Sequence, residues 1–241
     1  MPQIPKWLGD AVETVFSSKI PLVTITETSY IHRQLKKIRF EGNFEQLSFR
    51  TGQPVAIRVD DRNYRNYTPS FFDKARGICE ILFHLHGNGP GSNMAAELSE
   101  GDTLRMSTPR GKYLYQQQSN YHFFFGDETT LGLFKSLKDI INQEEQNYIG
   151  VLELSEQMMD VPDKLGLMVD CVPKTGQHAE QAIQYLRELD DVLWNLWKNG
   201  SFYLMGNASS IQNFRKALIL KGVNSSQIII QPYWAEGKTG L

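Results

Sequence analysis

The sequence predicts a two-domain protein, an N-terminal antiparallel β-barrel followed by an α/β domain with a parallel sheet. Residues 20–115 are short runs of alternating apolar and polar residues separated by turn residues, which is typical of antiparallel strands. Residues 121–234 instead interleave uniformly apolar runs with helical patterns, which is typical of a parallel sheet covered on both faces. The polar sequence QQQSN lies between the two patterns, so we expect domains at residues 1–118 and 119–241.

The barrel half begins with a segment of helical periodicity. Apolar residues recur at helical spacing in MPQIPKWLGDAVETVF, which predicts a short amphipathic helix that packs on the body of the protein. This segment lacks the unbroken apolar core of a signal peptide. Six strands are expected after it, at residues 21–31, 35–40, 54–59, 65–69, 77–86 and 102–111, and this number suggests a small antiparallel barrel.

The second half begins with the apolar strand 121–126, which ends at Gly126, and the helix 129–143. Further strands are expected at residues 148–154, 165–172, 201–206 and 227–234, with helices at 178–197 and 208–222. This alternation of strands and helices predicts crossover connections and a parallel sheet.

Composition narrows the function classes. The chain has 241 residues, of which 41% are hydrophobic and 22% charged, with a formal charge of -2; these values are typical of a soluble globular protein and offer no overall attraction to nucleic acid or an anionic membrane. No run approaches the length of a membrane span. Cys79 and Cys171 lie far apart and indicate neither a disulfide framework nor a metal pair. We therefore expect a reducing compartment and a cytoplasmic protein. We also expect the protein to act as a monomer.

One candidate binding motif is RNYRNYTPSFFD at residues 62–73. In a strand, Arg65 and Tyr67 share a face and Thr68 points to the other, next to Pro69, which weakens strand pairing. The guanidinium, the aromatic ring and the hydroxyl suit a phosphate, a stacked flat ring and a ring heteroatom. The same residue types are also ordinary half-buried strand residues, so the motif alone leaves both interpretations open.

A second candidate motif is HLHGNGPGSNMAAEL at residues 84–98, where a glycine-rich turn precedes a helical segment. Backbone N–H groups in such a turn favour a phosphate, although Ser92 stands where the dinucleotide fingerprint has its third glycine. A plain loop is the alternative. His84 and His86 lie two apart, but with no third ligand nearby we predict no metal site.

Together with GDETTL at residues 126–131, these motifs resemble the ferredoxin-reductase-type flavoproteins. More narrowly, the chain resembles the siderophore-interacting proteins, which are FAD-dependent ferric-siderophore reductases, from about Ile20 to its C-terminus. The other matching segments are TGQPV at 51–55, RNYT at 65–68, HGNGPGS at 86–92, GDTLRMSTPRG at 101–111, LMGNASSIQNFRKAL at 204–218 and YWAEG at 233–237.

The resemblance implies a role for each matching residue. Arg65 would contact the FAD diphosphate, Tyr67 would stack on the isoalloxazine and Thr68 would lie near its N5. The diphosphate and adenosine side would be lined by His86, Gly87, Gly89, Pro90 and Ser92. In the second half, Asp127 and Thr129 would face the flavin, Glu128, Gly206 and Asn207 the nicotinamide, and Tyr233 and Trp234 would shield the other flavin face. Gly206 and Asn207 replace a cysteine-glycine-proline turn of related reductases.

The implied function is electron transfer from NADH or NADPH through FAD to a ferric siderophore, with release of Fe(II). Because the cofactor carries the chemistry, no catalytic side chain is required of the protein. Lys238 is the first candidate to contact an anionic iron chelate, ahead of Arg58, Lys36 and Lys37. Glu153 and Glu156, without an arginine nearby, favour NADH over NADPH. The alternatives are a flavin reductase with another protein or a quinone as acceptor, and a carrier of flavin or chelate without catalysis.

Overall fold

The computed structural model describes residues 5, 7 and 20–238. The chain divides into two compact units between Leu114 and Tyr115, here called unit 1 and unit 2. The helix expected in the N-terminal segment falls almost entirely outside the described residues. No helix in the described part of the chain has both the length and the apolar character needed to cross a membrane.

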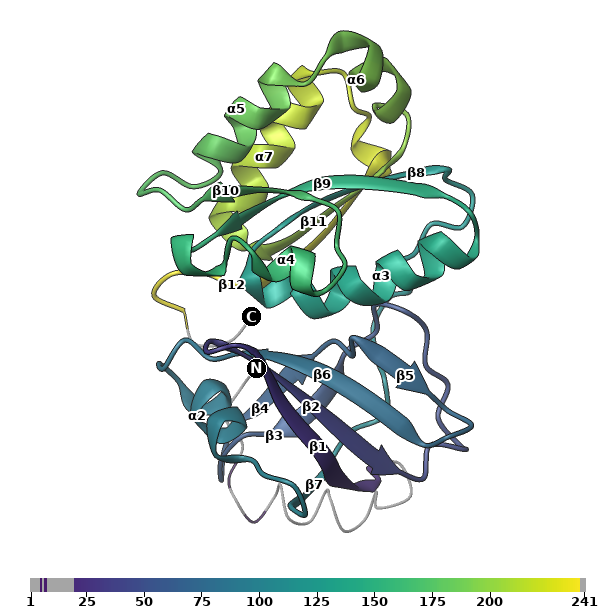
Figure 1. Ribbon diagram of the computed structural model, residues 1–241, viewed down its shortest axis with the longest axis vertical. Helices are drawn as coiled ribbons and strands as arrows, with labels where there is room; N and C mark the ends of the chain where they lie inside the picture. Colours follow the sequence, from purple (N-terminus) through teal and green to yellow (C-terminus); the bar gives the residue numbers. More distant parts are fainter. Residues whose placement is uncertain (1–4, 6, 8–19, 239–241) are drawn as a thin grey trace. The chain divides into compact units, whose positions relative to one another are not determined.

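Unit 1 is built from antiparallel strands and one short helix (Figure 1). One sheet has the order β5-β6-β2-β1-β7, and β3 pairs with β4 in a second sheet. An antiparallel bridge between Ile57 of β3 and Met106, next to β7, joins the two sheets. The elements are β1 Leu22–His32, β2 Leu35–Gly42, β3 Val55–Arg58, β4 Tyr64–Tyr67, β5 Phe71–Asp73, β6 Ile78–His84, α2 Pro90–Glu97 and β7 Thr103–Arg105.

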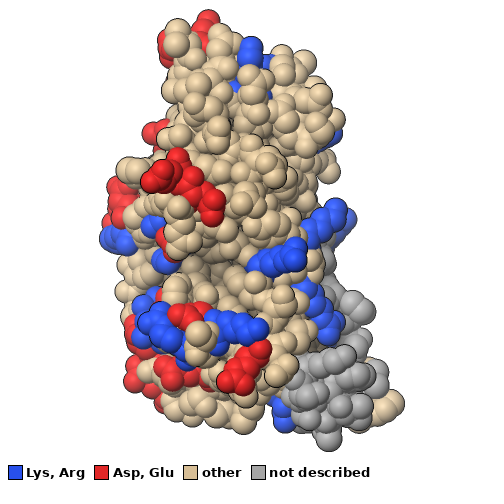
Figure 2. All heavy atoms as spheres, turned by 90° about the vertical axis from the view of Figure 1, so that its right-hand side faces the viewer, with Lys and Arg blue, Asp and Glu red and all other residues tan. Residues whose placement is uncertain are grey.

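The core of unit 1 follows from the period-two pattern of its strands. Val23 and Ile25 of β1, Ile38 and Phe40 of β2, and Ile81 of β6 are buried in one cluster, because alternate residues of a strand point to one face of the sheet. In the part of unit 1 drawn in Figure 2, acidic and basic side chains lie next to one another.

Unit 2 has a five-stranded parallel sheet of order β10-β9-β8-β11-β12. Helices α5, α6 and α7 cover one face, and α3 and α4 lie on the other (Figure 1). The elements are β8 Tyr121–Gly126, the 3₁₀ turn η2 Glu128–Thr130, α3 Leu131–Gln143, β9 Asn147–Leu154, η3 Glu156–Met158, α4 Val161–Lys164, β10 Asp170–Pro173, α5 Glu180–Glu188, α6 Asp191–Trp197, β11 Ser201–Asn207, α7 Ala208–Leu220, η4 Ser225–Gln227 and β12 Ile228–Trp234.

The apolar run of β8 is buried on both faces, as expected for a central parallel strand. Phe125 stacks on Phe214 of α7 with ring centroids 4.1 Å apart, whereas the next ring, Phe124, stacks on Phe134 of α3 at 4.6 Å. Successive side chains of one strand therefore hold both helical layers. The antiparallel and parallel sheets confirm the predicted fold class.

Two element predictions in unit 2 were wrong in extent. The single helix predicted at 178–197 is divided between α5 and α6, because Asp190 accepts hydrogen bonds from the backbone N–H groups of Val192 and Leu193 at 2.9 and 3.1 Å and so starts a new helix. The strand predicted at 165–172 is shorter and later, since β10 begins only at Asp170.

A buried polar network lies where the sheet of unit 2 begins. The Nε2 atom of His122 lies 2.9 Å from Oε1 of Gln146, and its Nδ1 lies 3.0 Å from the Tyr203 hydroxyl. The Tyr115 hydroxyl donates to the same Gln146 oxygen at 2.7 Å, and the backbone N–H of Gln116 donates to the Tyr203 hydroxyl at 3.1 Å. This network fastens the first residues of unit 2 to the sheet.

The network predicts a loss of stability in mild acid. Burial lowers the pKa of His122, opposed by its hydrogen bond with Gln146, while an unfolded histidine titrates near about 6.5. As the pH falls, His122 therefore binds a proton in the unfolded chain before it does so in the folded chain. The free energy of unfolding consequently has its full value above about pH 6.5 and decreases as the pH falls below it. We expect the His122→Gln variant to lack this pH dependence of the free energy of unfolding. Urea unfolding at about pH 7.5 and 5.5, followed by tryptophan fluorescence, checks it; the same pH dependence in both proteins would contradict the assignment.

Candidate functional site

The carboxyl ends of β8 and β11 form the point where the sheet of unit 2 reverses its strand order. β8 and β11 are neighbours, with β9 and β10 on one side and β12 on the other. Open α/β sheets bind ligands in the crevice beyond such a point. The predicted residues Asp127 and Asn207 lie here, at the ends of β8 and β11.

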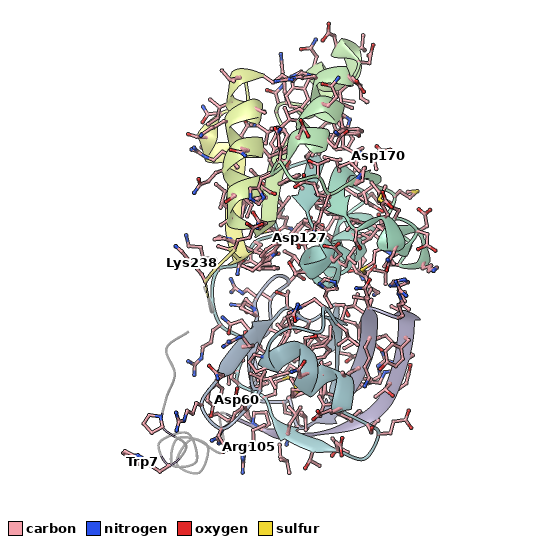
Figure 3. All side chains as sticks on the ribbon, turned by 90° about the vertical axis from the view of Figure 1, so that its left-hand side faces the viewer. Trp7, Asp60, Arg105, Asp127, Asp170 and Lys238 are labelled. Atoms are coloured by element: carbon pink, nitrogen blue, oxygen red, sulfur yellow. The ribbon has the colours of Figure 1, made fainter. Side chains whose placement is uncertain are left out.

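The Asp127 carboxylate joins three segments of unit 2. Its Oδ1 accepts hydrogen bonds from the backbone N–H of Thr129 at 2.9 Å and from the Thr129 hydroxyl. Its Oδ2 accepts from the backbone N–H of Asn207 at 3.0 Å and from the indole N–H of Trp234 at 2.7 Å. Asp127 is only 3% exposed, and four donors satisfy its charge. Its place in unit 2 is labelled in Figure 3.

Gly206 is required beside this carboxylate. Its φ of +99° lies in the region that favours glycine, and a Cβ there would lie 2.6 Å from Oδ2 of Asp127. Any side chain at this position would therefore displace the aspartate that the site is built around.

The side chain of Asn207 presents an unused donor. Its Oδ1 accepts hydrogen bonds from the backbone N–H groups of Ser209 and Ser210, both at 2.9 Å, and so caps α7. These contacts fix the amide orientation, because a backbone N–H needs an oxygen acceptor. The Nδ2 atom is buried and has no hydrogen-bond partner among the described residues. A buried donor of this kind is costly unless a ligand or water accepts from it.

Glu128, the second carboxylate of the turn, forms a buried ion pair. Its Oε1 accepts from the backbone N–H of Ser155 at 2.7 Å, and its Oε2 pairs with the ammonium of Lys174. Burial alone would raise the pKa of Glu128, but Lys174 and the hydrogen bonds hold it below its ordinary value. The Lys174 ammonium also lies 5.7 Å from the ring centroid of Trp234, within cation–π range.

A cavity of about 120 Å³ lies among these groups. Glu153, at the carboxyl end of β9, is 4% exposed in its wall, and burial raises the pKa of this carboxyl. The cavity therefore combines a buried amide donor, carboxyl groups and an indole, which suits a small planar polar group. Its lining includes Asp127, Glu153, Lys174, Asn207, Ser210 and Trp234.

The predicted residues of unit 1 also converge. Arg65 and Tyr67 share a face of β4, and both lie against Gly91 in the first turn of α2: a Cβ on Gly91 would come within 3.6 Å of Cγ of Arg65 and would overlap the Tyr67 hydroxyl. The Tyr67 ring packs on Phe83 with centroids 4.7 Å apart. Burial raises the pKa of Tyr67 to about 12, slightly opposed by Arg65, so the phenol is a neutral donor. Thr68 follows directly after β4.

The glycine-rich turn leads into an α2 helix without a side-chain cap. Gly87 and Gly89 have φ values of +77° and +106°, and the backbone N–H of Gly87 donates to Oγ of Ser92 at 3.1 Å. Gly89 is the N-cap residue and Pro90 the first helical residue, with no capping side chain. His86 accepts a hydrogen bond at Nδ1 from Asn88 N–H.

These residues fit the diphosphate of FAD. The first-turn N–H groups of Gly91 and Ser92 carry the positive end of the helix dipole, and the absent side chains of Gly87 and Gly89 allow backbone to approach a phosphate. Arg65 supplies a guanidinium, the group best suited to phosphate oxygens. The chemistry of the donor set therefore matches the group that the sequence motifs imply.

Other predicted residues lie as follows. Tyr233 is half-buried in β12, and Lys238 is exposed after it. Lys36 is wrong as a candidate contact for an iron chelate, because its side chain is buried in unit 1. Lys37 pairs with Glu27 at 3.0 Å. Within residues 20–238, no three His, Cys, Asp or Glu side chains are grouped as a metal site would require.

Sequence reasoning missed three contributors. Gly91 was not predicted as a site residue, although a Cβ on it would overlap the Tyr67 hydroxyl. Lys174 was not predicted as a site residue, and its signal is its place directly after β10, at the sheet edge where ligands bind. Glu153 was considered only for its charge, whereas its position at the end of an apolar strand puts it in the cavity wall.

Comparisons with known proteins bear on the fold and the cofactor. Residues 21–115 match the family model of the oxidoreductase FAD-binding domain. A segment of 72 residues is 33% identical to NADH-cytochrome b5 reductase 1 of Laccaria bicolor, and one of 73 residues is 30% identical to the Dictyostelium discoideum protein of that name; each covers 29% of this chain. The matched segments span 23% and 26% of those curated relatives, about a quarter of their length.

Solved structures extend the likeness to both units. The siderophore-interacting protein SipS of Aeromonas hydrophila has a TM-score of 0.75 at 20% identity, covering 92% of this chain and 93% of its own. A siderophore utilization protein of T. fusca has a TM-score of 0.71 at 21% identity, covering 92% and 95%. A ferredoxin-NADP+ reductase mutant of Plasmodium falciparum has a TM-score of 0.69 at 13% identity, covering 90% and 97%.

These findings confirm the resemblance that the motifs indicated and the prediction of FAD as cofactor. Residues 21–115 match an oxidoreductase FAD-binding domain, and the chain has the two-domain fold that siderophore-interacting proteins and ferredoxin reductases share.

Proposed function

We propose that this protein is a cytoplasmic, monomeric reductase that passes electrons from NADH or NADPH through FAD to ferric siderophores and releases Fe(II). Residues 1–118 bind FAD and residues 119–241 bind the nicotinamide nucleotide. The observation that carries the proposal is the cavity at the switch point of unit 2, with the unpartnered Nδ2 of Asn207 in its wall, in a chain whose other unit is an FAD-binding domain.

In unit 1, Arg65 and the first turn of α2 hold the diphosphate, with His86, Gly87, Gly89, Pro90 and Ser92 along it. Tyr67 stacks on the isoalloxazine, and the Thr68 hydroxyl lies near N5. FAD, when bound, supplies the conversion of a two-electron hydride into single electrons. The protein's part is to bind and orient, which explains why no nucleophile or paired acid and base is needed.

In unit 2, the Asn207 amide donates to the carboxamide oxygen of the nicotinamide, the acceptor that its Nδ2 lacks among the described residues. Glu128 and Gly206 shape the same side, and Asp127 and Thr129 face the flavin. Tyr233 and Trp234 shield the other flavin face. Glu153 and Glu156, with no arginine near them in the sequence, disfavour the additional 2′-phosphate of NADPH, which supports NADH as the preferred donor.

The acceptor is a ferric chelate with oxygen ligands. Fe(II) carries less charge than Fe(III) and is bound less tightly by an all-oxygen chelator, so reduction releases the metal and leaves the chelator intact. The protein itself then needs no iron ligands. Exposed Lys238, two residues after Glu236 in the cavity lining, attracts the anionic chelate.

Lys238→Ala is expected to raise KM for an anionic ferric catecholate about threefold, because one partly screened surface charge contributes up to about 1 kcal/mol. The KM for a neutral ferric hydroxamate should not change. Lys216→Ala, which removes another exposed lysine from α7, is the matched control. Steady-state rates of Fe(II) trapping measure both; an equal effect of the two substitutions would contradict a role for Lys238.

A second candidate function is a flavin reductase whose acceptor is another protein or a quinone, and the segments similar to NADH-cytochrome b5 reductases favour it. The experiment that separates the two supplies NADH and compares turnover with a ferric catecholate, a ferric hydroxamate, cytochrome b5 and a soluble quinone. Faster reduction of the iron chelates supports the proposal. Fast turnover with cytochrome b5 or quinone, and slow turnover with iron chelates, would overturn it.

A further inference from the structure

A buried lysine holds the far end of helix α2. Lys36, on β2, has only 3% of its surface exposed. Its Nζ lies 3.1 Å from the carbonyl oxygen of Ala95, 3.2 Å from that of Ala96 and 2.6 Å from that of Leu98. These carbonyls belong to the last turn of α2 and the residue after it. All three donors of the ammonium are thus used on one helix end.

Burying a lysine at the end of a surface helix costs free energy. A buried ammonium loses its hydration, and burial lowers the pKa of Lys36, opposed only by the charge of Asp102. Helix ends are usually completed by water or by a glycine turn at no such cost. The contact therefore fixes the position of α2 against β2 more firmly than a solvated end would.

The other end of the same helix is the uncapped turn that suits a diphosphate. The eight residues of α2 span about 12 Å, so an anchor on the last carbonyls sets both the lengthwise position and the tilt of the first-turn N–H groups. The Lys36 ammonium contacts the carbonyl groups at the C-terminal end of α2 and not the N–H groups at its N-terminal end. Its effect on a bound anion is exerted through the helix.

We propose that Lys36 is a positioning residue for FAD: by binding the carbonyls at the C-terminal end of α2, it holds the N-terminal N–H groups of that helix where the diphosphate needs them. The inference rests on the proposed placement of the diphosphate at α2. It predicts that Lys36 matters for ligands that carry phosphates and not for the flavin ring alone.

The test compares FAD with riboflavin, which has the same ring and no phosphate. Dissociation constants are measured on the full-length, flavin-depleted protein by quenching of flavin fluorescence. Lys36→Met keeps the length of the side chain and removes its donors, and it should weaken FAD binding at least about tenfold while riboflavin binding changes less than about twofold. Lys36→Gln, which keeps two N–H donors, should fall between, and Lys37→Met on the same strand should leave both constants unchanged.

Equal losses for FAD and riboflavin in Lys36→Met would overturn the inference, because they would indicate general loosening of unit 1. Unchanged FAD affinity would overturn it as well. If Lys36→Met does not fold, Lys36→Gln carries the same comparison. Wild-type protein that binds riboflavin as tightly as FAD would overturn the placement of the diphosphate, and the inference with it, before any variant is considered.

Discussion

Replacing Tyr67 and Thr68 together by alanine is expected to weaken FAD binding at least about a hundredfold while the protein stays folded. In the proposed site the Tyr67 ring would supply the surface that stacks on the flavin, and its hydroxyl lies against Gly91 in the first turn of α2. An aromatic contact and one or two hydrogen bonds together contribute about 3 kcal/mol, which corresponds to about two powers of ten in affinity. Flavin fluorescence titration of the flavin-depleted protein measures the constant.

Asn66→Ala is the matched control, because Asn66 lies between Arg65 and Tyr67 on β4 but is exposed. Tyr67→Phe keeps the ring and separates stacking from the contact of the hydroxyl, and it should lose less than the double variant. Circular dichroism and the melting temperature report the fold. A folded double variant that retains FAD with wild-type affinity would show that the β4 motif is an ordinary strand segment.

Asp127→Ala is expected to stop reduction of the flavin by NADH and to lower the free energy of unfolding by about 3 kcal/mol or more. The substitution leaves the backbone N–H groups of Thr129 and Asn207 and the indole N–H of Trp234 without their common acceptor. Each unsatisfied buried donor costs about 1–3 kcal/mol, and the three segments that form the cavity are no longer joined. FAD binding should fall much less, since Arg65 and Tyr67 belong to unit 1.

The matched control is Asp139→Ala, a partly exposed carboxylate on α3 that pairs with Lys135 at 3.2 Å; a surface pair of this kind contributes little. Anaerobic stopped-flow measurement of flavin bleaching gives the rate, and urea unfolding gives the stability. If the flavin of a folded Asp127→Ala variant bleaches at the wild-type rate, Asp127 has no role in the reaction with NADH.

Much of the fold could be predicted because local patterns of apolar and polar residues determine it. Alternation predicts the antiparallel strands of unit 1, and apolar runs such as Phe123 to Phe125 predict central parallel strands. The division of the helix at Asp190 was missed since a single capping side chain outweighs periodicity that continues across it. The start of β10 was placed too early because an apolar run does not distinguish a strand from the turn before it.

The candidate site was predictable where the regular geometry of a strand or of a parallel sheet brings residues together. Arg65 and Tyr67 share a face because strands have a period of two, and Asp127 and Asn207 meet because parallel strands end at one edge. The contacts between distant segments could not be predicted. The indole N–H of Trp234 donates to Asp127, which lies 107 positions earlier in the sequence. Lys36 resembles a surface lysine in the sequence, because its burial depends on the position of α2.

The central claim is most directly tested by an anaerobic visible absorption spectrum of the purified protein, taken before and after NADH or NADPH and again after a ferric catecholate or hydroxamate is added with an Fe(II) trap. The account predicts flavin bands that bleach with the nicotinamide, faster with NADH, and return as Fe(II) is trapped. Flavin bands that neither nucleotide bleaches, or no flavin bands even after reconstitution with FAD, would contradict it and favour a binding protein without electron transfer.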